Sequence, residues 1–160
     1  MPPSSLTLES TPISDAFIDK YLGGRGFGAK LVWDNLVKHG FKIDPLGPEN
    51  KLIFAVGPVT GIPLPGSGRH CVGAKSPLTG GFGAAEVGGN WAAQFKRAGF
   101  DALIVTGASE KPVYLWVKDG EVEIRDASNV WGKTTKETQM MIREELGESR
   151  AEMTMIGPGG

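Results

Sequence analysis

The stretch VYLWVKDGEVEIR, residues 113–125, decides the fold class that we predict from this sequence. Apolar and β-branched residues stand on both sides of Asp119-Gly120, a dipeptide that tolerates the positive φ of a tight turn. We therefore predict a β-hairpin with strands at residues 113–117 and 121–125. This hairpin favours a mixed or antiparallel sheet over a Rossmann-like one.

Outside the hairpin, helical and strand-like patterns alternate irregularly along the chain. Further strands are predicted at residues 51–56, 72–74, 82–85, 102–106 and 152–156. Helices are predicted after the N-cap residue Ser14, at residues 29–39, at residues 91–98, and from the capping-box pattern of Thr134 and Glu137 to about residue 146. The sequence therefore predicts a single α+β domain with mixed or antiparallel sheets and a few short helices.

Charge and cysteine content exclude several classes of protein. The 160 residues carry 17 basic and 18 acidic side chains, so a formal net charge of −1 gives no general attraction for nucleic acid or an anionic membrane. The single cysteine, Cys71, excludes an intrachain disulfide framework and a cysteine-only metal site.

Residues 1–10 lack the pattern of a signal peptide, and the most apolar stretch, residues 52–59, is too short to span a bilayer. We expect a cytoplasmic location.

Glycine is the most unusual part of the composition. The 24 glycines and 11 prolines make up over a fifth of the chain, and ten of the glycines lie at residues 57–89. Long glycine-rich loops are uncommon in a compact domain unless they are functional. Residues 66–69 (GSGR) offer one guanidinium suited to a phosphate or a planar polar ring, and Gly88-Gly89 precedes a helix. Tight turns, with Arg69 in a surface ion pair, explain these residues equally well.

Other patterns have a structural explanation beside a functional one. Residues 24–28 (GRGFG) lie near a helix start that could face an anion, but their spacing is not the dinucleotide fingerprint, and glycine also permits a close helix–helix turn. Residues 132–134 (GKT) lack the first glycine of a P-loop. His39 and His70 show no metal-ligand spacing. A nucleophilic pair of His70 with Cys71 is disfavoured, because neighbours on a strand point to opposite faces.

A set of ordered blocks resembles a known family. The blocks are YLGGRGFGAKLVWD (21–34), DPLGPENKLIFAVGPVTG (44–61), GSGRH (66–70), KSPLTG (75–80), Gly88-Gly89, AGFDALIVTG (98–107), EKPVYLWV (110–117), VEIRDAS (122–128), WGK (131–133) and the closing IGPGG. Their order and spacing resemble the N-terminal domain of the tungsten-containing aldehyde ferredoxin oxidoreductases. The resemblance implies an irregular segment at residues 1–17 and the family domain at residues 18–160.

The resemblance also implies a cofactor and its contacts. In that family the N-terminal domain forms a base beneath a tungsten atom held by two pterin dithiolenes, with a magnesium ion bridging the pterin phosphates. By position, Arg69 resembles an arginine that reaches the pterin, and Gly88 a glycine that contacts the cofactor. Glu86 stands in the place of an asparagine whose backbone carbonyl helps to bind the magnesium. An extra carboxylate there would repel phosphates unless it points away or meets a cation.

The function implied by the resemblance is that of a larger enzyme. We expect a tungsten- or molybdenum-bis-pterin oxidoreductase that converts aldehydes to carboxylic acids with ferredoxin as electron acceptor. Its [4Fe-4S] cluster and further pterin motifs belong to helical domains beyond IGPGG, so we expect a fragment or separately encoded piece that is inactive alone. Arg69, Glu86 and Gly88 are its cofactor-binding candidates, and no residue is a catalytic candidate.

The expected partners are implied by the same resemblance. They are the downstream helical domains and, for the whole enzyme, ferredoxin; a homo-oligomer is left open, and neither nucleic acid nor membrane is expected. The alternative is a non-catalytic stand-alone assembly or interaction module, or a degenerate remnant of the family. A free-standing nucleotide-binding domain is disfavoured, because the motifs at residues 24–28 and 132–134 both fail.

Overall fold

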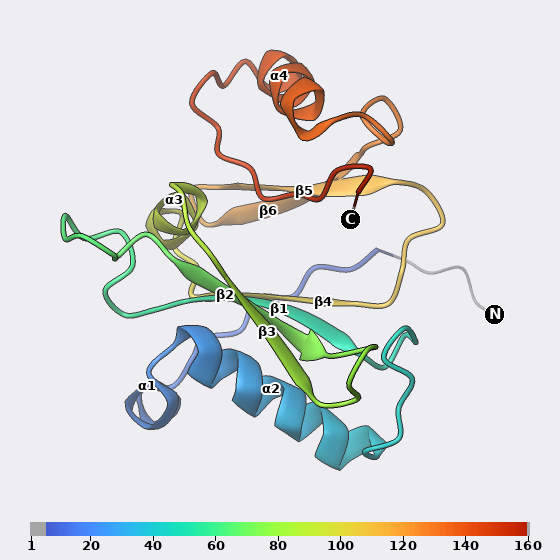
Figure 1. Ribbon diagram of the computed structural model, residues 1–160. Coiled ribbons are helices and arrows are strands. Elements are labelled where there is room, and N and C mark those ends of the chain that lie inside the picture. Colours follow the sequence, from blue (N-terminus) through green and yellow to red (C-terminus); the bar gives the residue numbers. More distant parts are fainter. Residues whose placement is uncertain (1–5, 160) are drawn as a thin grey trace. The chain divides into compact units, whose positions relative to one another are not determined.

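The computed structural model describes residues 6–159, which form two compact units (Figure 1). The first unit comprises residues 9–108, and the second comprises residues 109–159 with the short segment 6–8. Both contain helices and antiparallel strands, so the predicted α+β class is confirmed. No helix within residues 6–159 is long and apolar enough to cross a membrane.

The first unit is a four-stranded antiparallel sheet with one long helix against it. Its elements are α1 (Asp15–Tyr21), α2 (Gly24–His39), β1 (Lys51–Val56), β2 (His70–Lys75), β3 (Phe82–Val87), α3 (Trp91–Arg97) and β4 (Ala102–Thr106). The strand order is β3-β2-β1-β4, and every neighbouring pair is antiparallel. In Figure 1, α2 runs along one side of this sheet.

The two sheet faces carry different side chains because residues alternate along each strand. On β1, Ile53 and Ala55 are fully buried in a cluster with Phe27 and Val32 of α2. Phe54 lies between them in sequence, and its ring instead contacts Trp91 at the start of α3. The sheet therefore has α2 on one face and aromatic contacts with α3 on the other.

The start of α2 differs from the prediction. The helix begins at Gly24, one turn or more before residue 29, so the GRGFG tract is helical. Gly23 adopts φ 142°, and a Cβ atom at Gly26 would lie 2.1 Å from the carbonyl oxygen of Tyr21. Gly26 thus permits the close approach of α1 and α2, as the structural explanation of the tract expects, and Gly23 permits a close approach to the backbone of Val56.

The N-terminal boundary also changes. Ser14 caps α1 as predicted, since its hydroxyl accepts a hydrogen bond from the amide of Phe17. Because α1 begins at Asp15, the part of the predicted irregular segment that the structure describes ends at residue 14 rather than 17. Residues 1–5 of that segment lie outside the described residues.

Strands β2 and β3 are longer than the sequence predicted. Each has six residues, and all six pair in register, from His70 with Val87 to Lys75 with Phe82. The predicted segments at 72–74 and 82–85 were too short, because glycine lowers the strand propensity of this region while pairing with a neighbour overrides it. Lys75, which the sequence did not single out, is buried, and its Nζ donates to the carbonyls of Phe41 and Ile43 at 2.7 and 2.8 Å.

The second unit contains the hairpin and one helix: β5 (Val113–Lys118), β6 (Glu121–Asp126) and α4 (Thr135–Leu146). Asp119 and Gly120 both adopt positive φ, 51° and 86°, so the predicted tight turn is confirmed. Thr134 and Glu137 form the predicted capping box, and Gly147 ends the helix at φ 65°. The strand predicted at residues 152–156 is wrong. The sheet of this unit pairs only β5 with β6 among the described residues, and an unpaired segment forms no ladder.

Candidate functional site

The two glycine segments that the sequence singled out begin at the same end of the β2–β3 ladder. His70 pairs with Val87 there, Arg69 directly precedes His70, and Gly88 directly follows Val87. A Cβ atom at Gly68 would lie 3.1 Å from the carbonyl oxygen of Gly89. Residues 66–69 and 88–89 are therefore in contact, and the fold joins them into one surface.

Arg69 projects from this surface with its guanidinium unpaired. The residue is exposed, and no hydrogen bond or ion pair joins its side chain to another residue within 6–159. Its backbone oxygen accepts a hydrogen bond from the Thr60 hydroxyl at 3.4 Å, and Thr60 is itself buried. The surface ion pair that the alternative interpretation expected is not formed within the described residues, so the cation is available to a ligand.

The loop that leads to Arg69 is held in place by its own polar groups. The Ser67 hydroxyl hydrogen-bonds to the carbonyls of Ile62 and Leu64 at 2.6 and 2.8 Å. Arg97 of α3 donates to the carbonyl of Gly61 at 3.3 Å, and a Cβ atom at Gly61 would meet the backbone of Ala93. The glycine-rich loop is thus an ordered segment packed on α3.

Three glycines leave the surface open. A Cβ atom at Gly66, Gly88 or Gly89 would meet no atom within 4 Å. Gly66 and Gly89 adopt φ 85° and 99°, which favours glycine for conformational reasons, but Gly88 has no positive φ. Neither a positive φ nor packing against a described residue therefore requires glycine at position 88.

Glu86 carries an arginine partner that the sequence did not predict. Its carboxylate Oε1 lies 3.3 Å from Nη2 of Arg25, which belongs to the GRGFG tract at the start of α2. Glu86 is exposed and stands opposite Cys71 in the ladder. The Glu86 carboxylate, whose charge was expected to repel phosphates, is therefore paired with a cation of the protein itself. Only the tertiary structure shows this, because 61 residues separate the two side chains.

His70 and Cys71 point to opposite faces of the sheet, as expected for neighbours on a strand. The Cys71 Sγ lies near Gly28 of α2, whereas the His70 ring contacts Trp91 with 4.6 Å between ring centroids. Burial raises the pKa of the Cys71 thiol, Glu86 adds to the rise and Arg25 opposes it. A protonated, buried thiol facing away from the imidazole is no activated nucleophile.

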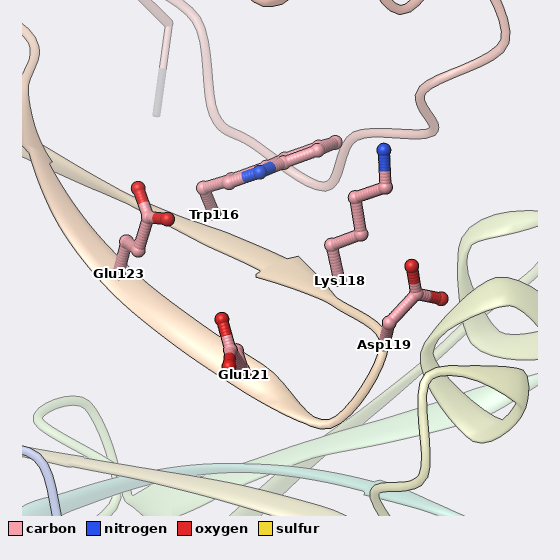
Figure 2. A pocket seen from close by; sticks show the side chains of 5 residues that line it. All are labelled: Trp116, Lys118, Asp119, Glu121 and Glu123. Carbon is pink, nitrogen blue, oxygen red and sulfur yellow. The ribbon is translucent and has the colours of Figure 1, made fainter.

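A hollow lies on the hairpin of the other unit. It has a volume of about 300 Å³ and is lined by Trp116, Lys118, Asp119, Glu121 and Glu123. Figure 2 shows the Trp116 ring between the side chains of Glu123 and Lys118. None of the predicted site residues lines it, and Lys118 is engaged in an ion pair with Glu148.

Titratable side chains do not gather into a metal site in the described part of the chain. Within residues 6–159, no three of the His, Cys, Asp and Glu side chains come together in a way that could hold a metal ion. The GKT pattern is likewise explained by the capping box, since Thr134 caps α4. The surface around Arg69 and Gly88 therefore stays the candidate site that the sequence predicted.

A family model matches nearly the whole chain. The family model described as "Aldehyde ferredoxin oxidoreductase, N-terminal domain" matches residues 4–160. The chain belongs to this family. The match begins at residue 4, whereas the sequence blocks indicated a start near residue 18.

Two curated relatives show how much of a family enzyme this chain represents. It is 47% identical over 154 residues to a tungsten-containing aldehyde ferredoxin oxidoreductase of Pyrococcus horikoshii, covering 96% of this chain and 25% of that protein. It is 49% identical over 141 residues to the enzyme of the same name from Thermococcus kodakarensis, covering 88% of this chain and 23% of that one. The chain therefore spans about a quarter of the length of these family members.

A solved structure shares the fold of this family domain. The active site complex BamBC of benzoyl coenzyme A reductase, in complex with 1,5-dienoyl-CoA, matches with a TM-score of 0.88 and 40% sequence identity. The match covers 94% of this chain and 23% of that one. The family domain thus occurs in enzymes whose names indicate different substrates.

Proposed function

We propose that this chain is the cofactor-bearing base domain of a tungsten- or molybdenum-pterin oxidoreductase that oxidises aldehydes to carboxylic acids with ferredoxin as electron acceptor. Membership of the aldehyde ferredoxin oxidoreductase family, together with the joined surface of Arg69 and Gly88, carries the proposal. Because the chain spans a quarter of its relatives, the proposal concerns an assembly with further helical domains. The cytoplasmic location stays a prediction.

The residues present fit a metal–pterin group. The unpaired guanidinium of Arg69 can donate two parallel hydrogen bonds to a planar heterocycle or a phosphate. Gly88 leaves open space for a ligand to approach the backbone. The pairing of Glu86 with Arg25 offsets the carboxylate charge, so the backbone carbonyl of Glu86 stays a candidate magnesium ligand.

The chemistry would be divided between the group and the protein. When bound, the metal–pterin group would supply the two-electron oxidation, and a [4Fe-4S] cluster in further domains of the larger enzyme would accept the electrons. The residues of this chain position and bind: Arg69 holds the pterin, Gly88 admits it, and α3 with Thr60 fixes the loop that carries Arg69. We assign no proton-transfer step to any residue of this chain.

The proposal is tested on the native assembly, purified through a tag on this chain. Tungsten, molybdenum and pterin content are measured per chain, with the rate of aldehyde-dependent viologen reduction. Arg69→Ala should weaken pterin retention about tenfold or more, because a charge-assisted hydrogen bond is lost. Arg150→Ala, which removes an exposed arginine at residue 150, should change neither quantity.

The outcomes separate the candidate functions. Metal and pterin in the wild-type assembly, both reduced in Arg69→Ala only, support the cofactor-bearing domain. A pure assembly without metal or pterin would instead favour a non-catalytic interaction module. Activity with benzoyl-CoA but none with aldehydes would still support the cofactor site. It would show that the substrate is an aromatic thioester, as the name of the benzoyl coenzyme A reductase complex indicates, rather than an aldehyde.

A further inference from the structure

His70 is buried without a hydrogen-bond partner, which calls for a physical explanation. Its ring is 1% exposed, and neither Nδ1 nor Nε2 has a hydrogen-bond partner within residues 6–159. Buried polar atoms in native proteins are almost always paired, since leaving one unpaired costs about 1–3 kcal/mol. A phenylalanine of similar shape would avoid this cost. The fold alone therefore gives no reason for histidine at this position.

The position of His70 connects it to the candidate site. It pairs with Val87 in the last register position of the β2–β3 ladder, directly before the two glycine segments diverge. Its ring packs on Trp91, with 4.6 Å between centroids, and stacks near Phe54. Residues 88–90 thus connect Val87 to Trp91. Both of these flanking residues lie next to His70.

The protonation state of the ring suits a ligand with mixed polarity. Burial lowers the pKa of His70, and the charge of Glu86 only partly opposes this. A neutral imidazole offers one N–H donor and one acceptor nitrogen. A pterin ring also carries both donors and acceptors, so either nitrogen can be satisfied by it.

We propose that His70 is a positioning residue of this site, and that its ring nitrogens receive their hydrogen-bond partner when the metal–pterin group binds at the glycine segments. This inference rests on the proposed function. Arg69 and Gly88 adjoin the ladder pair His70–Val87, so a ligand bound at these two residues lies next to the position of His70. The unpaired nitrogens are the feature that ligand binding satisfies.

The test uses His70→Phe, which keeps an aromatic ring against Trp91 and removes both nitrogens. In the chain purified without ligand, the melting temperature should stay equal or rise, because an unsatisfied polar group has been replaced. In the native assembly, bound pterin should dissociate about tenfold faster than from wild type, as the loss of one buried hydrogen bond implies. His39→Phe, the same change at an exposed histidine at the end of α2, is the matched control.

Each outcome supports or overturns the role of His70. A lower melting temperature of His70→Phe without ligand would mean that the nitrogens have an internal partner, and would overturn the inference. Unchanged pterin dissociation in a stable His70→Phe would overturn it as well. Wild-type assembly without any pterin would already contradict the proposed function, before the variants are compared, so the two failures are distinguishable.

Discussion

At the scale of single residues, glycine serves two different purposes in this chain. Gly23 and Gly26 are needed by the fold, since a side chain there would collide with backbone oxygens of Val56 and Tyr21 at 2.6 and 2.1 Å. Gly88 has no positive φ, and a Cβ atom there would meet open space. Composition counts all three alike, but only their surroundings separate the two glycines that packing requires from the one for which we propose a binding role.

This difference predicts opposite effects of the same substitution. Gly23→Ala should destabilise the chain by about 1–3 kcal/mol, because it adds a collision to a positive φ. Gly88→Ala should be neutral or stabilise by up to about 1 kcal/mol, since it only reduces the freedom of the unfolded chain. Urea denaturation followed by circular dichroism measures both.

The Gly88→Ala variant also tests cofactor binding. In the native assembly it should lower pterin content although the fold is intact, because the added methyl group occupies the open surface. Loss of stability in Gly88→Ala, or full pterin content with unchanged stability, would contradict the role given to this glycine.

At the scale of elements, the best predictions concern structures stabilised by neighbours in sequence. The hairpin turn at Asp119-Gly120, the N-cap at Ser14 and the capping box at Thr134 depend on residues at most three positions apart. The start of α2 was misplaced because tertiary contact with α1, rather than helix propensity, makes glycines acceptable there. The strand predicted at residues 152–156 failed because a strand also needs a partner.

The capping box of α4 predicts a pH effect. The Thr134 hydroxyl and amide hydrogen-bond to Glu137, and both lower the pKa of its carboxyl from 4.5. A lowered folded-state pKa means that the carboxylate stabilises the fold above pH 4.5, and that this contribution is lost as the pH falls through the folded-state value. Thr134→Ala should cost about 1 kcal/mol near neutral pH.

The control for this prediction is Lys136→Ala in the same turn, an exposed residue that makes no cap contact. The stability difference between wild type and Thr134→Ala should shrink as the pH falls below 4.5 and through the lowered folded-state pKa of Glu137, whereas that of Lys136→Ala should not follow the same course. Thermal melts at a series of pH values supply the comparison. An equal loss in both variants would show that the cap is not the stabilising feature.

At the scale of the whole molecule, the described residues expose many large apolar side chains. Leu64 is 62% and Leu78 92% exposed, and both lie in the glycine-rich region between β1 and β3. Exposed apolar side chains on a family domain that spans a quarter of its relatives are suited to contact with further protein. We therefore expect this domain to associate through such residues.

We predict that the chain expressed alone self-associates as its concentration rises. Leu64→Ser combined with Leu78→Ser should lower the sedimentation coefficient toward that of a monomer, because it removes apolar area from water contact. Lys42→Ser, an exposed polar change, should leave association unchanged. A wild-type chain that sediments as a monomer at every concentration in analytical ultracentrifugation would contradict this.

The sequence by itself determined the α+β class, the hairpin, the helix caps and the membership of a family, because each depends on local pattern or on ordered blocks along the chain. Only the tertiary structure decided that residues 66–69 touch residues 88–89, that Arg25 pairs with Glu86 and that His70 is buried without a partner among the described residues. The first and third features depend on the pairing of β2 with β3, whereas the Arg25–Glu86 pair joins α2 to β3. Such pairing depends on the whole sheet, and no local pattern encodes it.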